Sequence, residues 1–211
     1  MEGSRTAEPT TSQSDAGGVV RFGGWLFRHR SAIPVPVALA LLLVPPSSPP
    51  RWGFSAIGLV TLMGGELLRL WAVRHIGAIS RTRTDRLGPL IPSGPFALVR
   101  NPLYIGNILL WIGFALSAQL PWMAAVIAVV LGCEYHAIVR WEERLLESQL
   151  GDRYRAYAAS VSRWIPRPGR RSAQGTPVTL FSWRETLFSE RGTLIAIAVG
   201  LMLLGAKLKI N

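Results

Sequence analysis

The 211-residue chain contains a single cysteine, and its only lysines are Lys207 and Lys209. Cys133 has no second cysteine with which to form an intrachain disulfide and no neighbours at metal-ligand spacing, so we expect neither a disulfide nor a metal site. Because it lies inside an apolar segment, we expect Cys133 to be a small packing residue. Charged residues make up only 17% of the chain, against 49% hydrophobic residues.

The hydrophobic residues are gathered in blocks, unlike the mixture found in globular proteins. About 20 apolar residues span a bilayer, so the second and fourth blocks are long enough, and the third is adequate if it extends through Gln119. The first and last blocks need tilt, thinning or flanking residues to cross. We predict an all-α, polytopic membrane helical bundle of four to five transmembrane helices with a short cytoplasmic helical C-terminal region. The blocks are residues 33–44, 54–73, 104–118, 122–139 and 193–206.

Positive charge is abundant, with a formal net charge of +11, and nearly all of it is arginine. The arginines crowd before the first block and into residues 74–100 and 140–191, whereas the proline-rich loop near residue 50 carries only Arg51. This alternation follows the positive-inside rule and places the N-terminus and both arginine-rich segments in the cytoplasm. It favours anionic membrane lipids over nucleic acid as the partner. The two lysines would lie outside, so the sequence leaves open whether 193–206 spans the membrane or lies at its interface.

The helix boundaries follow from proline, glycine and the apolar pattern. The first helix is predicted over 31–44, with glycine ending the second at Gly77. Arg28 to Arg30 before a short apolar run is also typical of a signal peptide, but the proline cluster that follows has no cleavage pattern. Gly58, Gly64 and Gly65 are expected to let a neighbouring helix approach closely. Three of the other predicted helices begin near Trp52, near Pro102 and at Pro121, and the last of these ends near Leu150. A further helix is predicted over 152–161.

Two polar segments are expected to meet at one membrane face. The run from Gly94 to Tyr104 enters the third apolar block, with Asn101 as a predicted N-cap and Pro102 in the first helical turn. The pair Glu142-Glu143 lies where the fourth block ends. The short turn at 119–121 makes these two helices a hairpin, so both polar segments return to the same side.

Two further groups of polar residues lie on the apolar helices. Glu66 and Arg69 are three residues apart and share a helix face, which predicts a structural ion pair or an intramembrane functional pair. His136 adjoins the face that carries Tyr135 and is a candidate base, although a packed, hydrogen-bonded histidine is the ordinary interpretation.

Four motifs in fixed order resemble the integral-membrane methyltransferases, a group that includes isoprenylcysteine carboxyl methyltransferases and phospholipid N-methyltransferases. The resemblance covers about residues 64–168, and its specificity comes from the order and spacing of the motifs. They are Gly94-Pro95-Phe96-x-x-Val99-Arg100-Asn101-Pro102-Leu103-Tyr104, Glu142-Glu143-x-x-Leu146, Gly151-x-x-Tyr154-x-x-Tyr157 and Val161-x-Arg163-x-x-Pro166.

The resemblance implies an S-adenosylmethionine site at the cytoplasmic end of the bundle. Asn101 stands where many members have histidine, and asparagine keeps a hydrogen-bond donor and acceptor but does not titrate. Phe96 replaces a common tyrosine. The implied cofactor-binding residues are Arg100, Asn101, Pro102, Tyr104, Glu142 and Glu143, and the implied catalytic residues are Arg100, Asn101 and Glu143.

The chemistry of these side chains suits that cofactor. Glu142 and Glu143 can accept hydrogen bonds from its ribose diol or ammonium group, and the Arg100 guanidinium can hold its carboxylate. Tyr104 can stack on adenine or donate a hydrogen bond. Methyl transfer is an in-line displacement that depends on positioning and dehydration of the reactants. An amine acceptor must lose a proton, for which His136 is the candidate, whereas a carboxylate acceptor needs no base.

We therefore predict an integral-membrane enzyme that transfers a methyl group from S-adenosylmethionine to a lipophilic or membrane-embedded acceptor, a carboxylate or an amine. The acceptor, the methylated atom and the oligomeric state are not indicated by the sequence. The predicted organisation is a disordered tail (1–20), an N-terminal transmembrane region (21–63), a methyltransferase-like core (64–168), a linker (169–190) and a C-terminal transmembrane or interfacial helix (191–211).

Two other functions are compatible with the sequence. An NADPH-dependent membrane sterol or enone reductase would carry a related Arg-His-Pro-x-Tyr segment, although the Glu142-Glu143 pair and the motif with Tyr154 and Tyr157 favour methylation. A non-catalytic membrane protein is the other alternative, and Asn101 is the residue that favours it.

Overall fold

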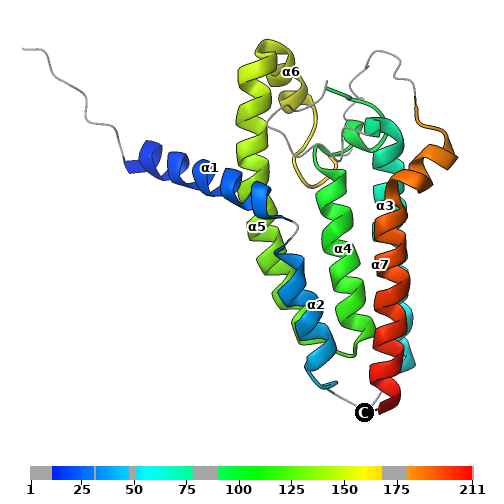
Figure 1. Cartoon of the computed structure of the whole chain (residues 1–211). Coiled ribbons are helices and arrows are strands. Elements are labelled where there is room, and N and C mark those ends of the chain that lie inside the picture. Colours follow the sequence, from blue (N-terminus) through cyan, green and yellow to red (C-terminus); the bar gives the residue numbers. More distant parts are fainter. Residues whose placement is uncertain (1–10, 31, 48–50, 78–89, 168–179, 211) are drawn as a thin grey trace, which may run out of the picture.

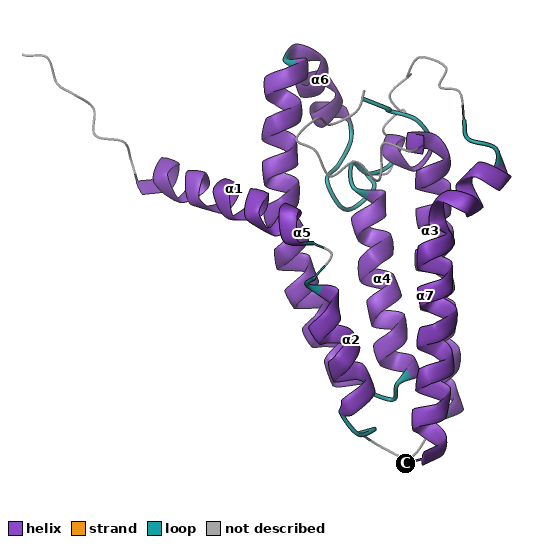
Figure 2. Cartoon of the chain, in the orientation of Figure 1, coloured by secondary structure: helices purple, strands orange, loops and turns teal. Residues whose placement is uncertain are grey.

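The computed structural model describes residues 11–30, 32–47, 51–77, 90–167 and 180–210. The described elements are helices apart from one isolated β-bridge between Val99 and Ser162 (Figure 2). The predicted all-α class is thereby confirmed. The elements are α1 (Thr11–His29), α2 (Pro34–Leu43), α3 (Trp52–Ile76), the 3-10 helix η2 (Gly94–Ala97), α4 (Pro102–Ser117), α5 (Pro121–Leu150), α6 (Asp152–Ser160) and α7 (Trp183–Ile210).

The long helices form a bundle that runs lengthwise through Figure 1. Helix α4 packs against both α3 and α5, and α7 packs against α3. Helix α5 extends beyond the start of α4 and leads into α6, while α1 lies against α5 and projects away from the bundle. The start of α4 and the end of α5 therefore lie at the same end of the molecule, called the α6 end below.

Three helices of the described part, α3, α5 and α7, are long and apolar enough to cross a membrane. The bent pair of α1 and α2 would make a fourth crossing if the two helices form one broken span. Helix α4 is apolar but has only 16 residues. The prediction of a polytopic bundle is thus confirmed. The sequence left open whether residues 193–206 span the membrane, and α7, which contains them, is long enough to do so.

Glycine allows α3 and α4 to touch along their backbones. A Cβ atom on Gly58 would lie 2.6 Å from the backbone nitrogen of Ser117, and one on Gly65 would lie 2.8 Å from the carbonyl oxygen of Gly106. A Cβ atom on Gly113 would lie 2.6 Å from the backbone nitrogen of Leu62. Such small-residue contacts are the usual means by which membrane helices pack closely. The prediction of close approach is confirmed for Gly58 and Gly65.

The prediction was wrong for Gly64, because a Cβ atom there would meet nothing within 4 Å. Adjacent residues on a helix point about 100° apart, so only one of two neighbouring glycines can face α4. Gly64 lies on the exposed side of α3.

Polar contacts fasten the bundle at the end opposite α6. Gln119, buried in the turn between α4 and α5, donates to the Arg51 carbonyl (3.2 Å) and to the Ser55 hydroxyl (2.9 Å). Near the end of α7, Lys207 Nζ donates to the Leu41 carbonyl (2.6 Å) and to the Val44 carbonyl. Lys207 thus satisfies carbonyls at the C-terminal end of α2, which lack partners within their own helix.

The structure corrects the predicted ends of the chain. The tail predicted to be disordered over 1–20 is helical from Thr11, while residues 1–10 lie outside the described part. Packing against α5 stabilises this helix, because Gly23 lies against the backbone of Ala137. The first apolar helix begins at Pro34 rather than residue 31, and the predicted linker 169–190 is helical from Trp183. In the fourth block, Cys133 is exposed rather than packed.

The two neighbouring glycines of α3 provide a matched test of the α3–α4 contact. We expect Gly65→Ala to lower the free energy of unfolding by about 1–3 kcal/mol, because the added methyl group overlaps the α4 backbone. Gly64→Ala should change it by less than about 0.5 kcal/mol. Thermal unfolding of both variants in the same detergent measures the difference. Equal effects of the two substitutions would contradict the packing described here.

Candidate functional site

Two distant segments are joined at the α6 end by backbone hydrogen bonding. The loop before α4 pairs with the loop after α6 through the bridge between Val99 and Ser162, and the Arg100 amide donates to the Ser162 carbonyl (2.8 Å). Pro102 occupies the first turn of α4, as predicted. These contacts hold Arg100 beside the end of α5, so the predicted meeting of the two polar segments is confirmed.

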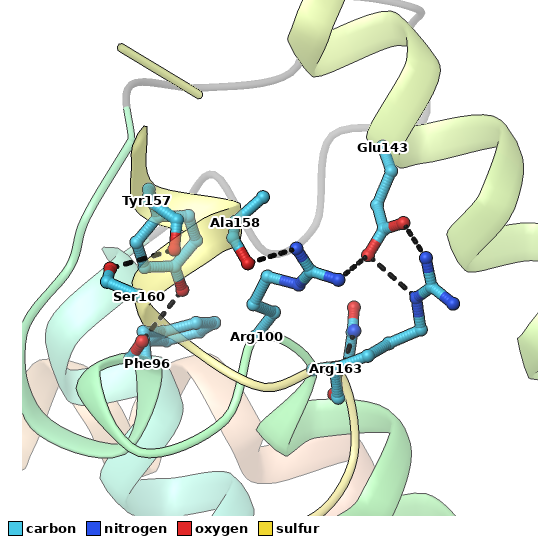
Figure 3. A network of polar contacts seen from close by, with 8 residues as sticks. Phe96, Arg100, Glu143, Tyr157, Ala158, Ser160 and Arg163 are labelled. Atoms are coloured by element: carbon cyan, nitrogen blue, oxygen red, sulfur yellow. Dashed lines mark hydrogen bonds and ion pairs between the residues drawn. The ribbon is translucent and has the colours of Figure 1, made fainter. Parts of the chain in front are cut away.

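Glu143 is bound by two arginines (Figure 3). Arg100 Nη2 lies 3.0 Å from Glu143 Oε1, and Arg163 Nε donates to the same oxygen (2.9 Å) while its Nη2 donates to Oε2. The second Arg100 amino group donates to the Ala158 carbonyl (3.1 Å). The hydrogen bond to Glu143 raises the pKa of Arg163 above its ordinary value. One carboxylate on α5 therefore fixes arginines from both loops.

Two tyrosines of α6 line the site at the α6 end. Tyr157 donates from its hydroxyl to the Phe96 carbonyl (2.7 Å), which fastens α6 to η2 (Figure 3). Tyr154 and Tyr157 are both buried. Burial raises the pKa of each phenol, so both hydroxyls remain protonated donors at neutral pH. The prediction that they pack α6 against the bundle is confirmed, and both also line the cavity described below.

Tyr104 contacts both Glu142, the second predicted carboxylate, and the buried ring of Tyr135. Its hydroxyl donates to Glu142 Oε1 (2.9 Å), and its ring lies 4.7 Å from the ring of Tyr135, centroid to centroid. Arg30, which follows α1, lies with its guanidinium 4.0 Å from the centroid of the Phe27 ring and lines the same cavity. The sequence analysis missed Arg30 because it lies outside every motif.

A cavity of about 1020 Å³ opens beneath this network. It continues from the α6 end along α4, and apolar residues of α2 and α7, including Leu41 and Leu204, line its far part. Sites of this kind combine an apolar lining with a few converging polar groups. All six residues predicted to hold the cofactor line the cavity: Arg100, Asn101, Pro102, Tyr104, Glu142 and Glu143.

Asn101 acts differently from its predicted role as a helix cap. It stands at the N-cap position of α4, but its side chain makes no capping hydrogen bond. Its amide instead donates to the Arg163 carbonyl (3.1 Å), because the loop after α6 lies against it. Asn101 therefore fixes the loop that carries one of the two arginines bound to Glu143.

His136 does not reach the site. It is exposed on α5 and is not among the residues that line the cavity, whereas its neighbour Tyr135 is buried and lines it. The two side chains lie about 100° apart around the helix, so only one of them can face inward. The interpretation of His136 as a packed histidine was wrong, and the structure does not bring its ring to the cavity, where a base for an amine acceptor would have to lie.

The predicted pair of Glu66 and Arg69 is part of a larger polar cluster inside the bundle. Arg69 Nε lies 3.4 Å from Glu66 Oε2, which confirms the ion pair. Arg69 also donates to Asn107 of α4 and to Glu190 and Thr193 of α7. The two α7 residues are three apart and share a helix face, a signal that the sequence analysis did not use.

Known proteins share the part of the chain that builds this site. Residues 54–153 match the model of the phospholipid methyltransferase family. The resemblance to the membrane methyltransferases is confirmed. That match includes the start of α4 and the Glu142-Glu143 pair, but it ends before Arg163 and α7.

Three relatives illustrate the range of similar proteins. The cobalt-zinc-cadmium resistance protein CzcN of Cupriavidus metallidurans is 28% identical over 76% of this chain and 74% of its own. The nickel-cobalt-cadmium resistance protein NccN of Alcaligenes xylosoxydans xylosoxydans is 24% identical over 68% and 67%. Protein-S-isoprenylcysteine O-methyltransferase A of Arabidopsis thaliana is 26% identical over 61% and 67%. The family match and the plant relative support membrane methyltransferase activity, whereas the two bacterial relatives are named for metal resistance.

The Asn101 contact can be tested by two substitutions at one position. Asn101→Ala should lower the free energy of unfolding by about 1 kcal/mol, because the Arg163 carbonyl loses its donor. Asn101→His keeps a ring N–H donor and should retain at least part of that stability. Chemical denaturation in detergent measures both values. A wild-type stability for Asn101→Ala would show that the contact contributes nothing.

Proposed function

We propose that this protein transfers a methyl group from S-adenosylmethionine to a lipophilic or membrane-embedded acceptor, a carboxylate or an amine. The observation that carries the proposal is that one cavity is lined at one end by the charged residues of two motifs and farther along by apolar residues of α2 and α7. A polar cofactor and an aliphatic chain could therefore meet inside one space. The similarity to membrane methyltransferases supports the reaction type.

The residues at the α6 end fit the charges of this cofactor. Arg100 has a buried Nε atom without a hydrogen-bond partner among the described residues, so it retains a donor for a carboxylate. Glu142 accepts one hydrogen bond from Tyr104, and a carboxylate has room for several, which leaves it able to accept from a hydroxyl or ammonium group. When bound, S-adenosylmethionine would supply an electrophilic methyl group attached to a positively charged sulfur.

The protein side chains would act by positioning. Glu143 holds Arg100 and Arg163, so we assign it a positioning role, while Arg100, Glu142 and Tyr104 would touch the cofactor. Fixed geometry removes much of the entropic cost of bringing two reactants together. Tyr154 and Tyr157 line the site and would help to exclude water, which would strengthen the electrostatic interactions within it.

The acceptor would enter from the bilayer. The far part of the cavity lies among α2, α4 and α7, where an aliphatic chain finds an apolar lining. The concentration of arginines in the segments that build the α6 end supports placing that end in the cytoplasm. Donor and acceptor would then arrive from different phases, the cofactor from water and the acceptor from lipid.

The cofactor site is tested by calorimetric titration of S-adenosylhomocysteine into the detergent-solubilised protein. Wild-type protein should bind saturably, and Arg100→Ala and Glu143→Ala should each weaken binding at least about tenfold, because a charged contact or its support is lost. Arg153→Ala is the matched control, since Arg153 is an exposed arginine of α6 that lies outside the cavity and outside the smaller pocket that Arg100 and Glu143 also line. It should bind like the wild type.

Two results would overturn this proposal. One is the absence of binding by folded wild-type protein at millimolar S-adenosylhomocysteine. The other is saturable binding of NADPH in its place, which would favour the reductase.

A further inference from the structure

A second, smaller pocket adjoins the Glu143 network at the α6 end. Its volume is about 340 Å³, and arginines of α5, of α6 and of the two paired loops converge on it. Its residues Arg100, Glu143 and Tyr154 also line the large cavity. We call it the arginine pocket after the arginines that line it, which are Arg100, Arg140, Arg144, Arg155 and Arg163.

The carboxylates of the arginine pocket are already committed to three of its arginines. Two glutamates, Glu143 and Glu147, stand against the five guanidinium groups. Glu143 accepts from two of the arginines through both of its oxygens (Figure 3). Glu147 pairs with Arg155 (3.3 Å), which also pairs with Asp152 at 2.7 Å. The pocket therefore keeps an excess of positive charge.

That excess resides on Arg140 and Arg144. Neither guanidinium has an ion pair or a hydrogen bond within the part of the chain that the structure describes. The two residues are four apart on α5, so they share a helix face. Like charges that converge on one pocket repel each other, and an anion bound between them would relieve that repulsion. Guanidinium groups bind phosphate through paired hydrogen bonds, which makes phosphate the anion that this donor set suits best.

The arginine pocket lies at the depth of lipid head groups. Arg140 directly follows the apolar block 122–139, whose length of about 27 Å is close to the roughly 30 Å of a bilayer's hydrocarbon core. Arg144 lies about 6 Å farther along α5, and the head-group layer is about 5–7 Å thick on each side. A phosphate group held by both arginines would thus lie where phospholipids carry their own phosphate.

The exposed stripe of α5 leads directly to the arginine pocket. Val126, Val129 and Cys133 are exposed, and their spacing of three and four residues places them on one helix face. Arg140 follows Cys133 by seven residues, about two turns, and therefore continues the same stripe. An acyl chain lying along these apolar side chains would bring the phosphate of its lipid to Arg140 and Arg144.

We propose that the arginine pocket binds the phosphate group of an anionic phospholipid whose acyl chain lies along the exposed stripe of α5. Basic pockets beside membrane helices suit such head groups. A zwitterionic lipid is disfavoured, because its ammonium group would be repelled by the same arginines. The family similarity does not assign this pocket, since Arg155 and Arg163 lie beyond residue 153, where the family match ends. The inference does not rest on the proposed function.

Native mass spectrometry of the full-length protein in detergent micelles tests this inference. The protein is titrated with phosphatidylglycerol or with phosphatidylcholine of identical acyl chains, and the dissociation constant is measured for each bound lipid. We expect one phosphatidylglycerol molecule to bind at least about tenfold more tightly than phosphatidylcholine, because hydrogen bonds between charged groups are stronger than neutral ones. Glycerol 3-phosphate, which carries a phosphate without acyl chains, should not displace it at submillimolar concentration.

Substitutions at the two unpaired arginines locate the site. Arg140→Gln and Arg144→Gln should each weaken phosphatidylglycerol binding about tenfold and leave phosphatidylcholine binding unchanged, because each removes one charged contact with the phosphate. Arg153→Gln is the matched control, since it removes the same charge from an exposed residue of α6 that lines neither the cavity nor the arginine pocket. Arg144 is exposed, so its substitution should preserve the fold, which thermal unfolding checks.

Three results would overturn the inference. One is equal affinity of the wild type for the two lipids. Another is equal weakening of phosphatidylglycerol binding by Arg144→Gln and Arg153→Gln, which would reduce the effect to overall charge. The third is displacement of the lipid by submillimolar glycerol 3-phosphate, which would make a soluble phosphate the occupant. The assay contains no S-adenosylhomocysteine, so its outcome is independent of the proposed methyl transfer.

Discussion

The backbone contact between α3 and α4 is the constraint on which the interior of this protein depends. Gly65 and Gly106 lie so close that neither has space for a Cβ atom, and the side chain of Arg69 crosses Gly106 at the same level. Only this proximity lets an arginine of α3 reach Asn107 of α4 and continue to α7. The same contact fixes α4 along its length, and α4 begins at the α6 end, beside Arg100 and Asn101. Small residues thus determine where the large polar groups lie.

Much of this arrangement follows from local sequence signals. The end of α3 at Gly77, the tight turn before Pro121 and the length of α5 were predicted because glycine, proline and long apolar runs act on the backbone directly. The meeting of Arg100 with Glu143 was also predictable, because a helical hairpin returns the chain to the membrane face that it left. For the six predicted site residues, the sequence indicated a shared location, and the structure places all of them on one cavity wall.

Tertiary packing decided the features that the sequence did not indicate. Asn101 has the chemistry of a helix cap, but the loop after α6 offers its amide a different partner. His136 and Tyr135 are neighbours in sequence, and only the position of the other helices determines which one faces inward. Helix α1 was missed because a glycine-rich polar sequence has a low intrinsic helix propensity. Packing against α5 stabilises the helix despite that low propensity. Glu190 had no visible partner in sequence, since Arg69 lies 121 residues away.

The bond between Lys207 and the end of α2 has a consequence for how this membrane protein is assembled. Helix α2 is synthesised well before α7, yet both line the same cavity. Chains generally fold from the N-terminus as they emerge from the ribosome. Until α7 is in place, the part of the cavity wall that α7 forms is missing. Any preference among ligands that depends on this wall therefore arises only after α7 has packed against α2 and α3.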